Sequence, residues 1–182
     1  MVSSMWQSVL DFWFKECEPK QWFDSDPVFD LLIGERFGSV LTQAKKGELF
    51  EWRIEAAGRL AEIIVLDQFS RNIYRDSADA FAADAQALVL AQEAVLAGCD
   101  EALPAEQRAF LYMPYMHSES KLMHEHAVVL FSASGLEENL AFEEKHKVII
   151  DRFGRYPHRN KLLGRQSTSE ELDFLTEPDS SF

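Results

Sequence analysis

The sequence predicts an all-α fold, and three observations lead to this expectation. Apolar residues recur with spacings of three and four through most of the chain, which is the period of an amphipathic helix. Glycine is scarce, at eight of 182 residues, and few segments alternate with the period of two that is typical of strands. Capping residues, prolines and glycines stand where helices would begin and end. We expect a compact array of about seven to eight antiparallel helices joined by short connections.

The first two predicted helices have clear starts. Ser4 can cap a helix that carries Trp6, Val9 and Leu10 on one side. At residues 26–27 a capping aspartate precedes a proline, whose missing N–H is harmless at the first helical position. The second helix should end by Gly47. Its apolar side is predicted to carry Phe29, Ile33 and Phe37.

The remaining elements follow from similar signals. Helices are expected over about 55–72, about 84–97, from Pro104 onward, about 119–132 and about 137–153. Gly98 and Gly154 are natural C-terminal stops. Residues 168–171 form a capping box that opens a last short helix. The chain suits a single domain over residues 1–177, followed by a frayed tail over 178–182.

Composition and charge exclude several classes of partner. The net charge of −13 disfavours nucleic acids and anionic membranes, which bind basic faces. The longest stretch without Asp, Glu, Lys or Arg covers 126–136, well short of the roughly 18–20 residues of a membrane helix. Cys17 and Cys99 lie far apart and form no CxxC pair. We therefore expect a reduced, cytoplasmic protein with no nucleic-acid or membrane partner.

A basic segment, residues 145–165, stands out in this acidic chain. It contains seven Lys or Arg residues and one acid, Asp151. Arginine forks suit bidentate binding of carboxylate or phosphate. Two interpretations remain open: the segment neutralises acids inside the fold, such as Asp67 or Glu119, or it binds an anion.

Polar groups also interrupt the apolar faces of predicted helices. On the third helix, Asp67 shares the apolar side with Leu60, Ile63 and Ile64, and Arg71 follows four residues later. A carboxylate on such a face is costly unless it is paired. The pattern indicates either a structural ion pair between Asp67 and Arg71 or an acid that lines a pocket.

Histidines end or face three of the later helices. His117 and Glu119 follow Pro114, which should kink the fifth helix. His-x-Glu on a helix points two side chains in different directions, so it is a poor metal site unless another helix supplies ligands, and we assign no metal ligand. The other interpretation of His117 is a simple boundary residue. We interpret His146 as a hydrogen-bonded core residue or one with a proton-transfer or ligand role, and His124 and His126 as surface or boundary residues.

The usual signatures of nucleotide-binding, serine-hydrolase, zinc-protease and calcium-binding proteins are absent from the sequence. The sequence therefore does not identify a cofactor. This leaves the polar clusters as the guide to function.

Several motifs in order resemble the bacterial family known as domain of unknown function 924, over nearly the full chain. They cover residues 9–14, 22–23, 47–52, 66–74, 110–119, 152–160 and 164–165. One departure is Ser70, where the family pattern usually has proline. The resemblance implies an all-α fold similar to tetratricopeptide-like α/α superhelices and implies no activity. The tetratricopeptide consensus itself is absent, which favours a compact, closed version.

The polar residues of these motifs supply the candidate site. We predict that the third, fifth and seventh helices bring them to one cleft, with Asp67, His117 and Arg155 at one cavity. The catalytic candidates are His117, Glu119, His158 and Asp67. The ligand-binding candidates are Arg71, Asn72, Tyr112, Arg152, Arg155, Arg159 and Asn160.

Three functions remain open at this stage. The first is a module that binds an anionic small molecule through its arginines. The second is an enzyme, a hydrolase or lyase, in which His117 or His158 is the general base and an acid orients it. The third is a protein-interaction scaffold that uses exposed aromatic residues.

Overall fold

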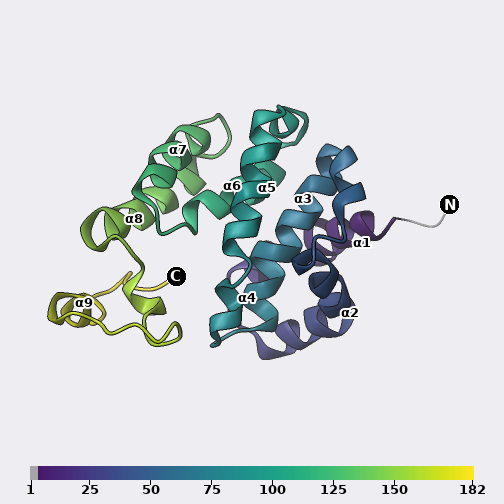
Figure 1. The fold of residues 1–182 in the computed structure, drawn as a ribbon. Helices are drawn as coiled ribbons and strands as arrows, with labels where there is room; N and C mark the ends of the chain where they lie inside the picture. The colour runs from purple at the N-terminus through teal and green to yellow at the C-terminus, as the bar shows by residue number, and fades with distance from the viewer. Residues whose placement is uncertain (1–3) are drawn as a thin grey trace.

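A computed structural model describes residues 4–182, and in this range the fold is all α-helical, without a strand. The helices are α1 (Met5–Asp11), α2 (Pro27–Lys45), α3 (Ala56–Ile64), α4 (Ser70–Ile73), α5 (Asp84–Leu96), α6 (Ala105–Met116), α7 (Lys121–Phe131), α8 (Glu137–Phe153) and α9 (Ser169–Phe174) (Figure 1). The all-α prediction is confirmed. None of these helices is both long enough and apolar enough to cross a membrane.

Local capping chemistry explains where the helices begin and end. The Oδ1 atom of Asp26 accepts a hydrogen bond from the backbone N–H of Val28 at 2.9 Å, which starts α2. The hydroxyl of Thr168 accepts one from the N–H of Glu171 at 3.2 Å, which starts α9. Gly154 ends α8 with a φ of 70°, a left-handed conformation that favours glycine.

The third predicted helix contains a π-helical turn that the sequence does not announce. A π-helical turn (Val65–Phe69) joins α3 to α4, so residues 56–73 form one continuous helical rod. All five residues of the turn are buried. The rod therefore passes through the centre of the protein at this point, and the turn carries Asp67 into the interior. Such wide turns are frequent at functional sites.

The core has a large and a small part. The large cluster draws on α1 to α7 and contains most of the buried aromatic rings. The small one consists of Ile149, Ile150, Tyr156 and Phe174. Figure 1 shows α1 to α5 on one side of α6 and α7 to α9 on the other. The basic segment leaves α8 and returns toward α6, so it lies between the two parts.

The C-terminal tail, residues 178–182, makes contacts with the helices before it. The carboxylate of Asp179 lies 3.5 Å from the ammonium of Lys145, and the Ser180 hydroxyl donates to the carbonyl of Leu175. The ring of Phe182 stacks on His146 with centroids 3.9 Å apart. The tail therefore lies against α8, because α8 offers it both a charge and an imidazole face.

Candidate functional site

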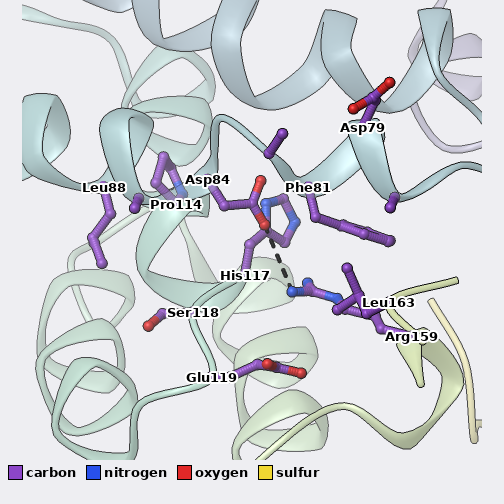
Figure 2. Close-up of a pocket in the computed structure, with 13 residues that line it drawn as sticks. Asp79, Phe81, Asp84, Leu88, Pro114, His117, Ser118, Glu119, Arg159 and Leu163 are labelled. Atoms are coloured by element: carbon purple, nitrogen blue, oxygen red, sulfur yellow. Dashed lines mark ion pairs between the residues drawn. The ribbon is translucent and has the colours of Figure 1, made fainter. Parts of the chain in front are cut away.

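Two cavities meet between the large and small parts of the core. The larger, of about 660 Å³, is lined by residues of α4, α6 and α8, by the basic segment and by the C-terminal tail. The smaller, of about 540 Å³, lies beside the start of α5 and the end of α6 (Figure 2). Phe81, His117 and Arg159 line both cavities and form the boundary between them.

A histidine and an aspartate contact each other at this boundary. His117 follows the last residue of α6, and its Nδ1 lies 2.7 Å from Oδ1 of Asp67 in the π-helical turn. The side chain of Gln68 donates to Oδ2 of Asp67 at 2.6 Å. Burial alone would raise the pKa of Asp67, but His117, Arg71 and Gln68 outweigh it and hold that pKa well below its usual range. Asp67 is therefore an ionised acceptor.

The tautomer of His117 follows from this contact. Since an ionised carboxylate only accepts, Nδ1 of His117 carries the proton and Nε2 keeps its lone pair. Burial, together with the positive charge of Arg71, lowers the pKa of His117. Near pH 7 the imidazole is thus neutral and presents a free acceptor nitrogen beside both cavities.

Arg71 is fully engaged by acids. Its two terminal nitrogens donate to the two carboxylate oxygens of Asp84 at 2.8 and 2.9 Å. It also lies 3.3 Å from Oδ1 of Asp67 and donates to the backbone carbonyl of that residue. Both sequence interpretations of Asp67 therefore describe part of the geometry: Asp67 pairs with Arg71 and also supports a histidine that lines the cavities.

Arg159 is buried and lacks such partners. Its residue surface is only 6% exposed, and its guanidinium lies 4.6 Å from the ring centre of Phe81 and 4.5 Å from that of Tyr156. Its nearest carboxylate is Asp84, at 3.6 Å (Figure 2), which Arg71 already holds. Within residues 4–182 its Nε is buried without a hydrogen-bond partner. Burial, together with the charge of Arg71, lowers the pKa of Arg159, as expected for an undercompensated cation.

Two further histidines line the larger cavity in neutral form. Nδ1 of His146 donates to the carbonyl of Phe142 at 2.7 Å, so its Nε2 is an acceptor. Burial lowers the pKa of His146 to about 3. Burial, with the charge of Arg159, lowers the pKa of His158 to about 4. Over residues 4–182, no three His, Cys, Asp or Glu side chains are placed to hold a metal ion.

The family model for bacterial proteins of unknown function, domain of unknown function 924, matches residues 9–179. The chain belongs to this family. A solved structure of a protein of unknown function from Agrobacterium tumefaciens is 38% identical and has a TM-score of 0.88. The match covers 93% of this chain and 96% of that one. No curated protein matches significantly.

Membership of domain of unknown function 924 confirms the resemblance seen in the sequence and supports the helical fold. Neither the family description nor the structural relative states an activity. Any function must therefore be argued from the side chains themselves.

The structure places some predicted site residues together. Asp67 contacts His117, as the pairing of the third and fifth predicted helices required. Three other candidates, Arg71, Asn72 and His158, line the larger cavity. Glu119 lines the smaller cavity, and Arg159 lines both.

The other candidates lie elsewhere, and the placement of Arg155 needs correction. Arg155 lines neither cavity because it donates to both carboxylate oxygens of Glu171, at 2.7 and 2.8 Å. Arg152 pairs with Glu170 on the surface, and Asn160 bonds to Ser167 and Glu171. The hydroxyl of Tyr112 donates to Asp100, away from both cavities.

Glu119 acts as a structural clamp, because its carboxylate joins the backbone of Tyr156 to the side chain of Arg165. Its carboxylate accepts two bonds from Arg165, at 2.7 and 2.9 Å, and one from the backbone N–H of Tyr156 at 2.7 Å. The basic segment thus neutralises acids through Arg152, Arg155 and Arg165. Arg159 instead has its nearest carboxylate at 3.6 Å.

Sequence reasoning missed several residues of the site. Phe81, Asp84 and Tyr156 border the guanidinium of Arg159, yet nothing in their local sequence signals it. The expectation for His124 was wrong. His124 is fully buried. Its two ring nitrogens have partners there, since Glu143 of α8 lies 2.6 Å from Nδ1 and the carbonyl of Ser118 accepts from Nε2. His126 is exposed, as expected.

Proposed function

We propose that this protein binds a small organic anion in the larger cavity, with Arg159 as the group that receives the negative charge. The observation that carries the proposal is the state of Arg159: a side chain nine-tenths buried, at the boundary of two cavities, whose Nε has no partner among residues 4–182. A buried charge without hydrogen bonds costs stability. Such a cost is expected to persist where the group has a function.

The surroundings favour a strong interaction with an incoming anion. The cavity volume of about 660 Å³ lies within the range of small-molecule sites, roughly 300–1,000 Å³. Charges interact more strongly away from bulk water. A guanidinium can offer two parallel N–H bonds to one carboxylate, and these charge-assisted bonds are among the strongest in proteins.

Thermal unfolding with a panel of organic and inorganic anions tests the proposal. A ligand at about 100 times its Kd stabilises the folded state by about 2.7 kcal/mol, which raises Tm by several degrees for a chain of this size. We expect such a rise for the wild type and none for Arg159→Met. Arg152→Met is the matched control, since Arg152 is exposed and lines neither cavity. Equal shifts in all three proteins would contradict the proposal.

A second candidate function, hydrolysis, is favoured by the contact between His117 and Asp67. Nε2 of His117 is placed to accept a proton from a water molecule whose oxygen attacks a substrate carbonyl carbon. Asp67 would stabilise the resulting imidazolium. The same proton then passes to the leaving group as its bond to carbon breaks, so that water is added across that bond. Arg159 would hold a carboxylate of the same substrate.

Proton release from a panel of esters and amides of organic acids tests this candidate. A general base contributes about 10²–10⁴-fold, so His117→Gln should lose at least about 100-fold in rate. His126→Gln, an exposed position, should keep the wild-type rate. Equal rates in both variants, or no hydrolysis by the wild type, would contradict the enzyme candidate and leave the binding proposal intact.

A further inference from the structure

We infer that the ligand of this site is an amphipathic monocarboxylate: one carboxylate on Arg159, and an aromatic or aliphatic body along the aromatic residues of the larger cavity. The inference rests on the proposed anion binding and names its chemical class. Three sets of observations support it: the partners of the arginines, a row of adjacent rings, and the exposed aromatic residues of the cavity.

In the part of the chain that the structure describes, one arginine of the larger cavity is left without a close hydrogen bond to a carboxylate. Three arginines line the larger cavity, and two of them are already neutralised. Arg71 is bound by Asp84, and Arg75 donates to both oxygens of Asp30 at 2.5 and 2.8 Å. Within residues 4–182, Arg159 instead has its nearest carboxylate, Asp84, at 3.6 Å, and its Nε has no hydrogen-bond partner.

Further acids disfavour a more highly charged ligand. The carboxylates of Asp24, Asp76 and Glu138 also line the larger cavity. They repel each negative charge that a ligand carries, so the repulsion grows with the charge of the ligand. A phosphate monoester or a dicarboxylate therefore fits this cavity worse than a single carboxylate, whose two oxygens match the guanidinium fork.

A row of rings leads away from the guanidinium of Arg159. Tyr156 lies against it at 4.5 Å, and the edge of His146 meets Tyr156 at a centroid distance of 5.9 Å. The ring of Phe182 stacks on that of His146, with centroids 3.9 Å apart. His146 is neutral because burial lowers its pKa to about 3, so the row carries no charge of its own. Tyr156 and His146 are themselves buried, so Phe182, which is 49% exposed, is the ring of this row that a ligand can cover.

Aromatic side chains in the same cavity remain unusually exposed. Phe23 is 69% exposed, Phe142 53% and Phe182 49%, and all three line the larger cavity. Met113 and Met116 of α6 line it as well, and methionine adapts to apolar ligands of different shape. Covering such rings with an apolar body is favourable, whereas a small hydrophilic anion would leave them in water.

Isothermal titration calorimetry with the full chain tests the inference. The probes of the proposed class are 4-phenylbutyrate and octanoate. Of the comparison compounds, acetate lacks the apolar body, phenyl phosphate carries a phosphate in place of the carboxylate, and 4-phenylbutanamide lacks the charge. We expect at least one probe of the proposed class to bind one to one and at least tenfold more tightly than all three comparison compounds. Arg159→Met should weaken that probe at least tenfold, and Arg152→Met should leave it unchanged.

Two substitutions at exposed positions separate the apolar contribution from folding. Phe142→Ala should weaken 4-phenylbutyrate or octanoate several-fold, because Phe142 is half exposed and lines the cavity. Phe50→Ala is the matched control at an exposed phenylalanine that lines neither cavity. Circular dichroism spectra check that each variant is folded.

The possible outcomes distinguish a wrong ligand class from a failure of the proposed anion binding. If acetate or phenyl phosphate binds as tightly as the probes of the proposed class in an Arg159-dependent manner, the class is wrong and anion binding stands. If 4-phenylbutanamide binds equally well, the negative charge of the ligand has no role, and both the ligand class and the proposed anion binding are contradicted. If no anion binds below millimolar concentration, the proposed function itself is contradicted.

Discussion

The Nδ1 atom of His117 lies 2.7 Å from the Oδ1 atom of Asp67, although fifty residues separate them in the sequence. This contact joins the end of α6 to a π-helical turn in the centre of the protein. It orients the imidazole so that Nε2 remains an acceptor beside both cavities. The arrangement of the candidate site therefore depends on the central turn, and substitutions there should affect both stability and the histidine.

Asp67→Asn should weaken the fold measurably. The change removes the charge that pairs with Arg71 and accepts from His117. Breaking a buried ion pair costs about 3–5 kcal/mol, and we expect the lower end because Asp84 still pairs with Arg71. Urea unfolding measures the loss. Asp24→Asn, at an exposed residue, should change the free energy of unfolding by less than about 1 kcal/mol. Equal effects would contradict the role of Asp67.

His146 should make the protein less stable in mild acid. Burial lowers its pKa from the usual 6.5 to about 3. Between these values the unfolded chain binds more protons than the folded one, so stability is full above about pH 6.5 and falls as pH drops toward 3. The contribution approaches about 1.4 kcal/mol per pH unit. Urea unfolding between pH 4 and 6 should show a shallower pH slope for His146→Gln than for the wild type.

The exposed His126 provides the control for this pH dependence, since His126→Gln makes the same substitution on the surface of α7. It should keep the wild-type slope. A wild-type slope in His146→Gln would show that this imidazole is not held neutral by burial.

Glu119 and Arg165 should behave as one unit. Two hydrogen bonds join them, and the same carboxylate holds the backbone N–H of Tyr156. Glu119→Gln and Arg165→Met should each lower the free energy of unfolding by about 1–3 kcal/mol. The double variant should lose clearly less than the sum, since the second change removes a partner already lost. Strict additivity in the double-mutant cycle would contradict the clamp.

Gly58 should tolerate no side chain. A Cβ atom there would lie 2.1 Å from the backbone oxygen of Trp52. Gly58→Ala should therefore lower the free energy of unfolding by about 1–3 kcal/mol or more. Gly34, inside α2, has nothing within 4 Å of such a Cβ, so Gly34→Ala should stabilise by roughly 0.5–1 kcal/mol. Thermal unfolding of both variants checks the contrast.

Local chemistry made much of the helical pattern predictable. The aspartate–proline start at 26–27, the capping box at Thr168 and the glycine stop at Gly154 each act within a few residues. The pairing of Asp67 with Arg71 was predictable for the same reason, because four residues form one helical turn.

The identity of the unpaired cation was not predictable from the sequence. Arg155 and Arg159 look alike in the basic segment, and they differ only in what the fold brings to them. Glu171 of α9 binds Arg155, whereas Arg159 meets two rings and an aspartate that is already paired. The π-helical turn escaped prediction because packing on all sides of it, rather than its own residues, stabilises the wide turn.

The central claim is that Arg159 is not needed to stabilise the fold. Its most direct test is a comparison of the free energies of unfolding of Arg159→Met and Arg71→Met. Arg71→Met strands the carboxylates of Asp67 and Asp84 and should cost about 3–5 kcal/mol. Arg159→Met keeps an apolar side chain between Phe81 and Tyr156 and should remain within about 1 kcal/mol of the wild type, or exceed it. Equal destabilisation by the two changes would contradict the account, because it would mean that Arg159 serves the fold rather than a ligand.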